Sequence, residues 1–292
     1  MYKPYATLLI LSVFFSVVLQ ARQPSFPRTS FSHFYFVLDS GAYKALLADK
    51  FCADTLFYMQ AGSSKTDQGD WSGNYITGPV DYLEAFHPQS FPGADAGDIG
   101  WGEMLHRSQE SKKLLQEWKT LANENIEVQH FTTGNGRDTI IVELLHYRDS
   151  MLLGGATSFF VLYYHPALLK KAGFTEEEIS AGIDQEMINK RWYAGKPASR
   201  LYQKTKAVHL RLTPGEYERH RIALQAMGYN ETAKQTFKKD VEIIISLDDK
   251  PGSRLQKIEF SLAATTEPRT IVLSPDAYIR LNGDRGELVV KQ

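Results

Sequence analysis

The sequence predicts an α+β protein in which one order of elements, strand–helix–strand–strand–strand (βαβββ), recurs along the chain. Three observations predict this class. Residues 31–86 show that order of apolar runs and turns, residues 98–164 show it again, and the aromatic strands that close the two units both end in His-Pro. The recurrence indicates tandem modules that arose by internal duplication.

The first unit begins with an aromatic, β-branched strand at residues 31–38. Asp39 or Ser40 then caps a helix that ends near Phe51. Its buried face carries Tyr43, Leu46, Leu47 and Phe51, and further strands are predicted at 56–60, 73–77 and 80–86.

The second unit repeats this order. A short strand is predicted at 98–104 and an amphipathic helix at 108–123. Strands follow at 126–132, 139–146 and 157–164, and the last of them ends in His165-Pro166 as the first unit ends in His87-Pro88. We therefore assign residues 31–166 to one paired domain.

The remainder of the chain contains a helical connector and a third βαβββ-like module. Residues 167–205 mix apolar positions with many charges, which indicates helices. The third module, 206–292, opens with a strand at 207–212, and Thr213 to Glu216 matches a capping box with proline at the first helical position. Further strands are predicted at 237–247, 255–263 and 270–281.

Residues 1–21 have the pattern of a secretory signal peptide. Lys3 precedes an apolar run over residues 6–19, and Ala21 supplies the small residue before cleavage. The sequence therefore predicts a secreted or periplasmic protein, and an uncleaved membrane anchor is the alternative.

Composition narrows the classes of partner. The formal net charge of −1 provides no field that favours nucleic acid or an anionic membrane. Cys52 is the only cysteine, so no intramolecular disulfide forms, and its apolar helical setting predicts a buried thiol. The sequence contains neither a Gly-x-Ser-x-Gly elbow nor a Walker-type phosphate loop.

Several motifs resemble the glyoxalase, or vicinal oxygen chelate, superfamily, and in particular its uncharacterised bacterial glyoxalase-like members. The first strand has His33 early and Asp39 at its end, residues 82–84 (Tyr-Leu-Glu) resemble the last strand, and residues 97–101 resemble the opening of a second module. The resemblance implies curved mixed sheets around a cavity. It also implies metal ligands at His33, Glu84, Asp98 and Leu162, of which Leu162 cannot bind a metal and Asp98 replaces a more usual His.

The same residues can be weighed by their chemistry. An imidazole and carboxylates suit Zn, Fe, Mn or Ni, so His33, Glu84 and Asp98 are candidate ligands of one divalent metal. Glu84 stands out because a carboxylate within an apolar strand is costly unless it has a partner. Trp71, Tyr75 and Trp101 are candidate ligand-binding residues, with core packing as the alternative, and Glu103 is a candidate for proton transfer.

Two functions remain open from the sequence. One is a metal-free exported protein that binds a small apolar or aromatic molecule. The other is a metal-dependent lyase, isomerase or dioxygenase in which the metal stabilises a developing enolate. Both depend on His33 and Glu84 sharing one face of a curved sheet.

Overall fold

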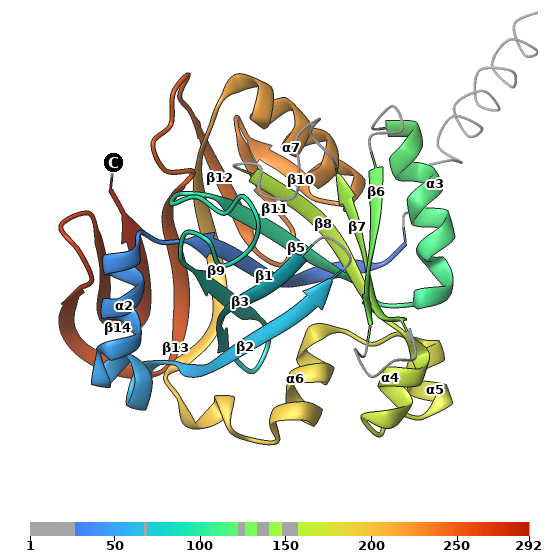
Figure 1. Ribbon diagram of the computed structural model, residues 1–292, viewed down its shortest axis with the longest axis horizontal. Coiled ribbons are helices and arrows are strands. Elements are labelled where there is room, and N and C mark those ends of the chain that lie inside the picture. The colour runs from blue at the N-terminus through green and yellow to red at the C-terminus, as the bar shows by residue number, and fades with distance from the viewer. Residues whose placement is uncertain (1–26, 67–68, 122–125, 133–139, 148–156, 292) are drawn as a thin grey trace, which may run out of the picture.

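The computed structural model describes residues 27–66, 69–121, 126–132, 140–147 and 157–291. These residues form a closed eight-stranded barrel, a group of short helices and a six-stranded sheet (Figure 1). The α+β class predicted from the sequence is confirmed. Around the barrel the strand order is β1-β4-β3-β2-β6-β7-β8-β5, so the first and second halves of the chain segment meet at two seams.

The first half of the barrel has β1 and β4 side by side and parallel, and its other neighbouring strands are antiparallel. Asp39 begins the helix because its carboxylate accepts hydrogen bonds from the backbone N–H groups of Gly41 and Ala42, at 2.8 and 2.9 Å. The elements are β1 (Thr29–Val37), α2 (Ser40–Ala48), a π-helical turn (Cys52–Leu56), β2 (Tyr58–Thr66), β3 (Gly69–Thr77) and β4 (Tyr82–Phe86).

The second half repeats this arrangement. Its first and last strands, β5 and β8, are again parallel neighbours, and β5 pairs antiparallel with β1 to form the main seam. The other seam joins β2 to β6, where Thr66 pairs with Phe131 among the described residues. The elements are β5 (Ile99–Leu105), a 3₁₀ turn (Ser108–Glu110), α3 (Ser111–Leu121), β6 (Ile126–Thr132), β7 (Ile140–Tyr147) and β8 (Thr157–Tyr164).

Three short helices connect the barrel to the second sheet. Thr175 and Glu178 form a capping box at the start of α5, and the Asp184 carboxylate caps α6 by accepting from the N–H of Met187 at 2.9 Å. These helices lie together below the barrel in the view of Figure 1. They are α4 (Pro166–Lys171), α5 (Glu176–Ala181) and α6 (Gln185–Tyr193), followed by a 3₁₀ turn (Pro197–Ser199).

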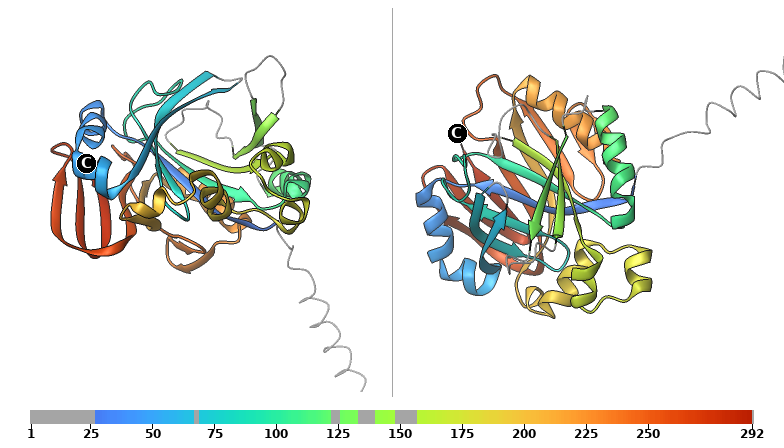
Figure 2. Two further views of the ribbon diagram at one scale, coloured as in Figure 1. Left: turned by 90° about the horizontal axis from the view of Figure 1, so that it is seen from below. Right: turned by 45° about the vertical axis from the view of Figure 1, so that its right-hand side comes forward.

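The C-terminal sheet has the order β10-β11-β12-β9-β13-β14, in which β9 and β12 are parallel. The predicted capping box is confirmed, since Thr213 and Glu216 bond reciprocally at the start of α7. The elements are β9 (Tyr202–Leu212), α7 (Pro214–Ala226), β10 (Asn230–Ala233), β11 (Thr236–Lys238), β12 (Glu242–Leu247), β13 (Leu255–Val272) and β14 (Ala277–Val290). Helix α2 lies beside the β13–β14 hairpin, and α3 lies on the opposite side near α7 (Figures 1 and 2).

One hydrophobic core joins the barrel to this sheet. It includes Phe31 and Trp101 from the barrel and Tyr229 from the segment that follows α7. The ring of Trp101 lies 4.6 Å from that of Phe31 and 5.9 Å from that of Tyr229, between centroids. Polar contacts cross the same boundary, because the buried Asp81 carboxylate accepts from the Tyr202 hydroxyl at 2.5 Å.

Several local predictions differ from the structure. The strand predicted at 237–247 is two strands, because the chain turns between Lys238 and Glu242 and pairs β11 with β12 as a hairpin. Cys52 is fully buried, as predicted. The predicted signal peptide, 1–21, lies outside the described residues. Within the described part of the chain, none of the helices is long and apolar enough to span a membrane.

Candidate binding site inside the barrel

Alternate residues of β1 face opposite sides of the barrel wall. Phe34 and Phe36 belong to the core that the helices and the second sheet cover. Tyr35 and Val37 belong to a separate cluster with Phe160 of β8, in which residues of the helical connector such as Phe174 and Ile188 also pack. Because side chains alternate along a strand, His33 shares the inner face with Tyr35.

His33 is a buried, stacked imidazole. Its ring lies 4.4 Å from the ring of Tyr82, nearly parallel at 13°, and 5.2 Å from that of Phe160. A side chain on Gly102 of the neighbouring strand would collide with the imidazole, so this glycine makes room for it. Burial lowers the pKa of His33 to about 3, and the ring is therefore neutral at pH 7.

Glu84 lies on the inner face of β4, where it is 8% exposed. Burial raises its pKa to about 8, which keeps most of the carboxyl protonated at pH 7. Its charge acts on several phenols around it, contributing to raised pKa values of Tyr35, Tyr82, Tyr164 and Tyr193. The Glu84 carboxyl forms no hydrogen bond with a residue whose side chain the structure describes, and its oxygens are not among the fully enclosed, unpaired polar atoms of that part of the chain, which belong to Glu117, Trp118, Arg200 and Glu287.

The structure brings His33 and Glu84 to one face of neighbouring strands. In the parallel pairing of β1 with β4, His33 is opposite Tyr82 and Tyr35 is opposite Glu84. The offset of two residues on adjacent strands separates their Cα atoms by roughly 8 Å. The geometry that both functional hypotheses need is therefore present.

Trp71 and Tyr75 also lie on this inner surface. Trp71 stacks on Phe91, with ring centroids 4.2 Å apart, and meets the edge of Tyr35. Tyr75 is directly opposite Glu84 in the β3–β4 pairing, and its ring lies over Gly62, where no side chain would fit. Tyr75 is thus next to the buried acid, whereas Trp71 lies four positions further along the same strand, against Tyr35 and Phe91.

Asp98 does not join His33 and Glu84 in a ligand set. Its carboxylate accepts from the N–H of Asp95 at 2.9 Å, and its carbonyl accepts from the N–H of Val37 at 2.9 Å. These bonds hold it in the turn that leads into β5. Among the residues whose side chains the structure describes, a set that leaves out most of β6 and all of β7, no three or more His, Cys, Asp or Glu are grouped so that they could hold a metal ion. The described residues therefore do not supply the three ligands that a catalytic metal needs.

Trp101 and Glu103 face away from the barrel interior, which corrects the roles predicted for them. Trp101 packs in the core between the barrel and the second sheet. Glu103, fully buried, accepts hydrogen bonds from Trp101 Nε1 at 3.1 Å, Tyr229 Oη at 2.7 Å and Lys239 Nζ at 2.9 Å. The two positions share a face, as their spacing predicted, but it is the outer face, because Gly100 and Gly102 occupy the inner positions of β5.

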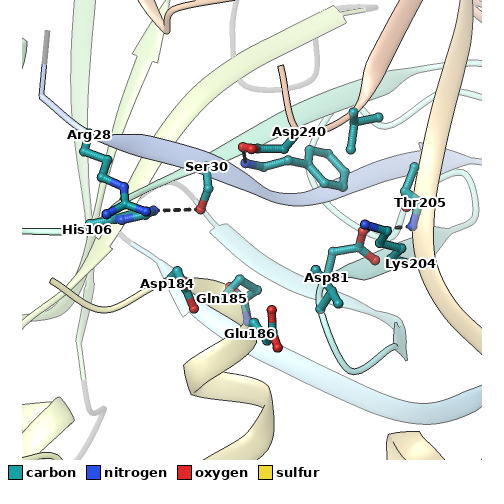
Figure 3. A pocket seen from close by; sticks show the side chains of 13 residues that line it. Arg28, Ser30, Asp81, His106, Asp184, Gln185, Glu186, Lys204, Thr205 and Asp240 are labelled. Atoms are coloured by element: carbon teal, nitrogen blue, oxygen red, sulfur yellow. Dashed lines mark hydrogen bonds between the residues drawn. The ribbon is translucent and has the colours of Figure 1, made fainter. Parts of the chain in front are cut away.

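A hollow of about 330 Å³ lies between the barrel, α6 and the C-terminal sheet (Figure 3). Its acids are already engaged by the protein. Asp81 accepts from Thr205 N–H at 2.8 Å, Asp240 accepts from Phe31 N–H at 3.1 Å, and Glu186 pairs with Lys190. His106 is neutral at pH 7, since burial lowers its pKa to about 4, and it bonds Ser30 at 2.8 Å. Satisfied groups make this hollow a weaker candidate than the barrel.

Sequence reasoning missed three aromatic residues near Glu84. Tyr35 follows His33 by two positions, so alternation along the strand could have found it. Tyr164 ends β8, and Tyr193 comes from the connector helix α6. Tyr193 comes 109 positions after Glu84 in the chain. No local signal predicts that it lies close enough for the charge of Glu84 to raise its pKa.

Comparisons with known proteins give a family but no activity. None of the curated proteins matches the chain. Among solved structures, a hypothetical protein from Staphylococcus aureus is similar at 12% sequence identity, with a TM-score of 0.49, over 84% of this chain and 95% of that one. The model of a family of unknown function, DUF5829, matches residues 31–286, which is most of the chain, and the protein therefore belongs to that family.

Proposed function

We propose that this protein binds a small apolar or aromatic molecule inside the barrel, with the carboxyl of Glu84 as the polar anchor. The observation that carries the proposal is the burial of this acid among phenol rings without a hydrogen-bond partner in the described residues. Such a group costs folding free energy, on the order of 1–3 kcal/mol, unless something pairs with it. A bound molecule is the partner that would offset this cost.

The arrangement of strands supports a paired-module architecture of the glyoxalase type. Each half of the barrel has the order βαβββ, and each has its first and last strands parallel and adjacent. In this proposal the two halves curve around one cavity, and the inner faces of β1, β3 and β4 form its described wall. The signal peptide predicted at 1–21 would deliver the mature protein to the periplasm or the exterior.

The chemistry of the wall defines the class of ligand. Trp71, Tyr75 and Tyr82 offer aromatic surfaces, which favour a flat or apolar body. A protonated Glu84 both donates and accepts hydrogen bonds, while a neutral His33 offers one ring nitrogen as acceptor. A small aromatic compound with one hydroxyl or carbonyl group fits this combination.

A metal-dependent lyase, isomerase or dioxygenase is the second candidate. The observation that favours it is the neutral His33 imidazole, because metals bind the unprotonated nitrogen. His33 and Glu84 are two of the ligands such a centre would need, and the described residues place no third one beside them.

One experiment separates the two candidates. Purified mature protein is analysed for bound metal and screened by ligand-observed NMR against small phenols and aromatic ketones. We expect binding that Glu84→Leu weakens about tenfold or more, since it leaves the polar group of the ligand unpaired at a cost of about 1–3 kcal/mol, whereas Glu84→Gln keeps a donor and an acceptor and should retain most of the binding. Glu259→Gln, at a half-buried glutamate of the other sheet, should leave binding unchanged.

The outcomes discriminate clearly. Stoichiometric Zn, Fe, Mn or Ni that disappears in Glu84→Ala would favour the enzyme. Metal-free protein that binds none of the aromatic probes, together with a lower melting temperature for Glu84→Leu, would contradict the binding proposal. If Glu84 serves ligand binding, its burial lowers the stability of the unliganded protein. Without ligand, the melting temperature of Glu84→Leu should therefore be higher than that of the wild type.

A further inference from the structure

A line of hydrogen bonds connects the connector helix α6 to the inner wall of the barrel. It begins where Asn189 Nδ2 donates to the carbonyl of Gly78 at 2.9 Å and to that of Asp81 at 3.4 Å. Asn189 Oδ1 accepts from Gln185 Nε2 at 2.8 Å. Gln185 Oε1 accepts from Ser32 Oγ at 2.8 Å. All of these side chains are buried, with exposures of 3% or less.

The donor and the acceptor of each hydrogen bond in this line follow from the end at which backbone carbonyls accept. Backbone carbonyls only accept, so the nitrogen of the Asn189 amide must face them and its oxygen must face Gln185. The nitrogen of the Gln185 amide must then face Asn189, which leaves its oxygen for Ser32. A hydroxyl has one hydrogen, and Ser32 gives it to Gln185.

Ser32 therefore can only accept from its other neighbour. That neighbour is Nδ1 of His33, 3.1 Å from the Ser32 oxygen. The proton of the neutral imidazole consequently resides on Nδ1, and Nε2 carries the lone pair. No described residue donates a hydrogen bond to Nε2.

We propose that Gln185 and Asn189 are positioning residues that fix His33 as its Nδ1–H tautomer, so that Nε2 is held as an acceptor for a ligand group that donates. The existence of a ligand rests on the proposed function. The inference adds to that function the group that the ligand presents to His33, which is a hydroxyl or N–H donor. The tautomer itself is a property of the unliganded protein.

The tautomer can be measured directly. Mature protein labelled with ¹⁵N-histidine is examined at pH 7 by long-range ¹H–¹⁵N correlation, in which protonated and unprotonated ring nitrogens have different shifts. His33 is one of eight histidines, and its signals are identified by their loss in His33→Gln. We expect Nδ1 in the protonated range and Nε2 in the unprotonated range. The reverse pattern, or two protonated nitrogens, would overturn the inference.

Variants test the relay away from the imidazole. In Asn189→Leu the Gln185 amide loses the acceptor for its nitrogen and can rotate, after which Ser32 donates to His33 and the proton moves to Nε2. Ser32→Ala removes the acceptor of the Nδ1 proton with a smaller change of volume, so it keeps the test usable if Asn189→Leu does not fold. We expect the Nδ1 resonance to shift to the unprotonated range in both variants.

Asn74→Leu is the matched control. Asn74 also donates through its amide, to the hydroxyl of Tyr43 at 2.6 Å, but it lies outside the relay. Its loss should leave the tautomer of His33 unchanged. An unchanged tautomer in Ser32→Ala would refute the relay. If the expected tautomer is observed while no aromatic probe binds, the proposed function fails and the inference about the tautomer stands.

Discussion

Two buried glutamates, Glu84 and Glu103, lie on opposite faces of the same barrel wall and have opposite surroundings. Glu103 accepts from an indole, a phenol and an ammonium group, which satisfy its carboxylate. Glu84 faces phenol rings, and no described group forms a recorded hydrogen bond with it. Strand residues of the same type therefore differ in their surroundings, and Glu84, for which no partner is described, is the candidate for ligand binding.

The ion pair between Lys239 and Glu103 leads to a prediction about stability. Lys239→Met leaves a fully buried carboxylate without its counter-ion, and we expect it to destabilise the protein by about 3–5 kcal/mol. Lys238→Met, at the exposed neighbouring lysine, should change stability by less than about 0.5 kcal/mol. Urea unfolding of both variants measures the change in the free energy of unfolding. Equal midpoints would show that the pair contributes nothing, and the double variant Glu103→Gln/Lys239→Met should recover part of the loss.

At the scale of the element, β5 is built around two glycines. Gly100 and Gly102 occupy inner positions, and the rings of Tyr35 and His33 from β1 cover them. This strand was predicted within one residue of its observed bounds because apolar and turn patterns are local. Which residues of β5 face inward and which face outward was not predicted, because the sequence does not tell which side of a strand the second sheet will cover.

Gly100→Ala tests this packing. The added methyl group would overlap the Tyr35 ring, and we expect a loss of about 1–3 kcal/mol from overpacking. Gly215→Ala, in the first turn of α7, meets only the end of Arg219 at an ordinary contact distance and should be neutral or slightly stabilising. Thermal melts compare the two. Gly100→Ala in a Tyr35→Leu background should cost less, and an equal cost in both backgrounds would rule out the Tyr35 clash.

At the scale of the whole molecule, the barrel and the C-terminal sheet share one core. The boundary predicted from the sequence at residues 205 and 206 falls inside β9, which runs from Tyr202 to Leu212. Apolar residues on both sides of that boundary pack in the same cluster, and Asp81 and Glu103 bond across it. Such an interface favours unfolding of the two parts together.

Cooperative unfolding can be measured with probes in separate parts. All four tryptophans, Trp71, Trp101, Trp118 and Trp192, precede the second sheet, and in a Trp101→Phe background, which removes the one that packs on Tyr229, the fluorescence of the others reports the barrel and connector. Pulsed hydrogen exchange of amides in β13 and β14 reports the sheet. We expect the two transitions to have the same denaturant midpoint, and loss of protection in the sheet at lower denaturant would show independent domains.

The amino-acid sequence by itself determined the α+β class, a helix start at Asp39 or Ser40, the helix start at Thr213 and the burial of Cys52. These features depend on alternation, capping and spacing, which act over a few residues. Tertiary structure alone decided that Glu103 is satisfied by Tyr229 and Lys239, that Asp98 stays in a turn, and that α6 orients His33 through Ser32. These contacts join residues more than 100 positions apart or depend on which groups a turn engages, so strand order and sheet packing, rather than local pattern, establish them.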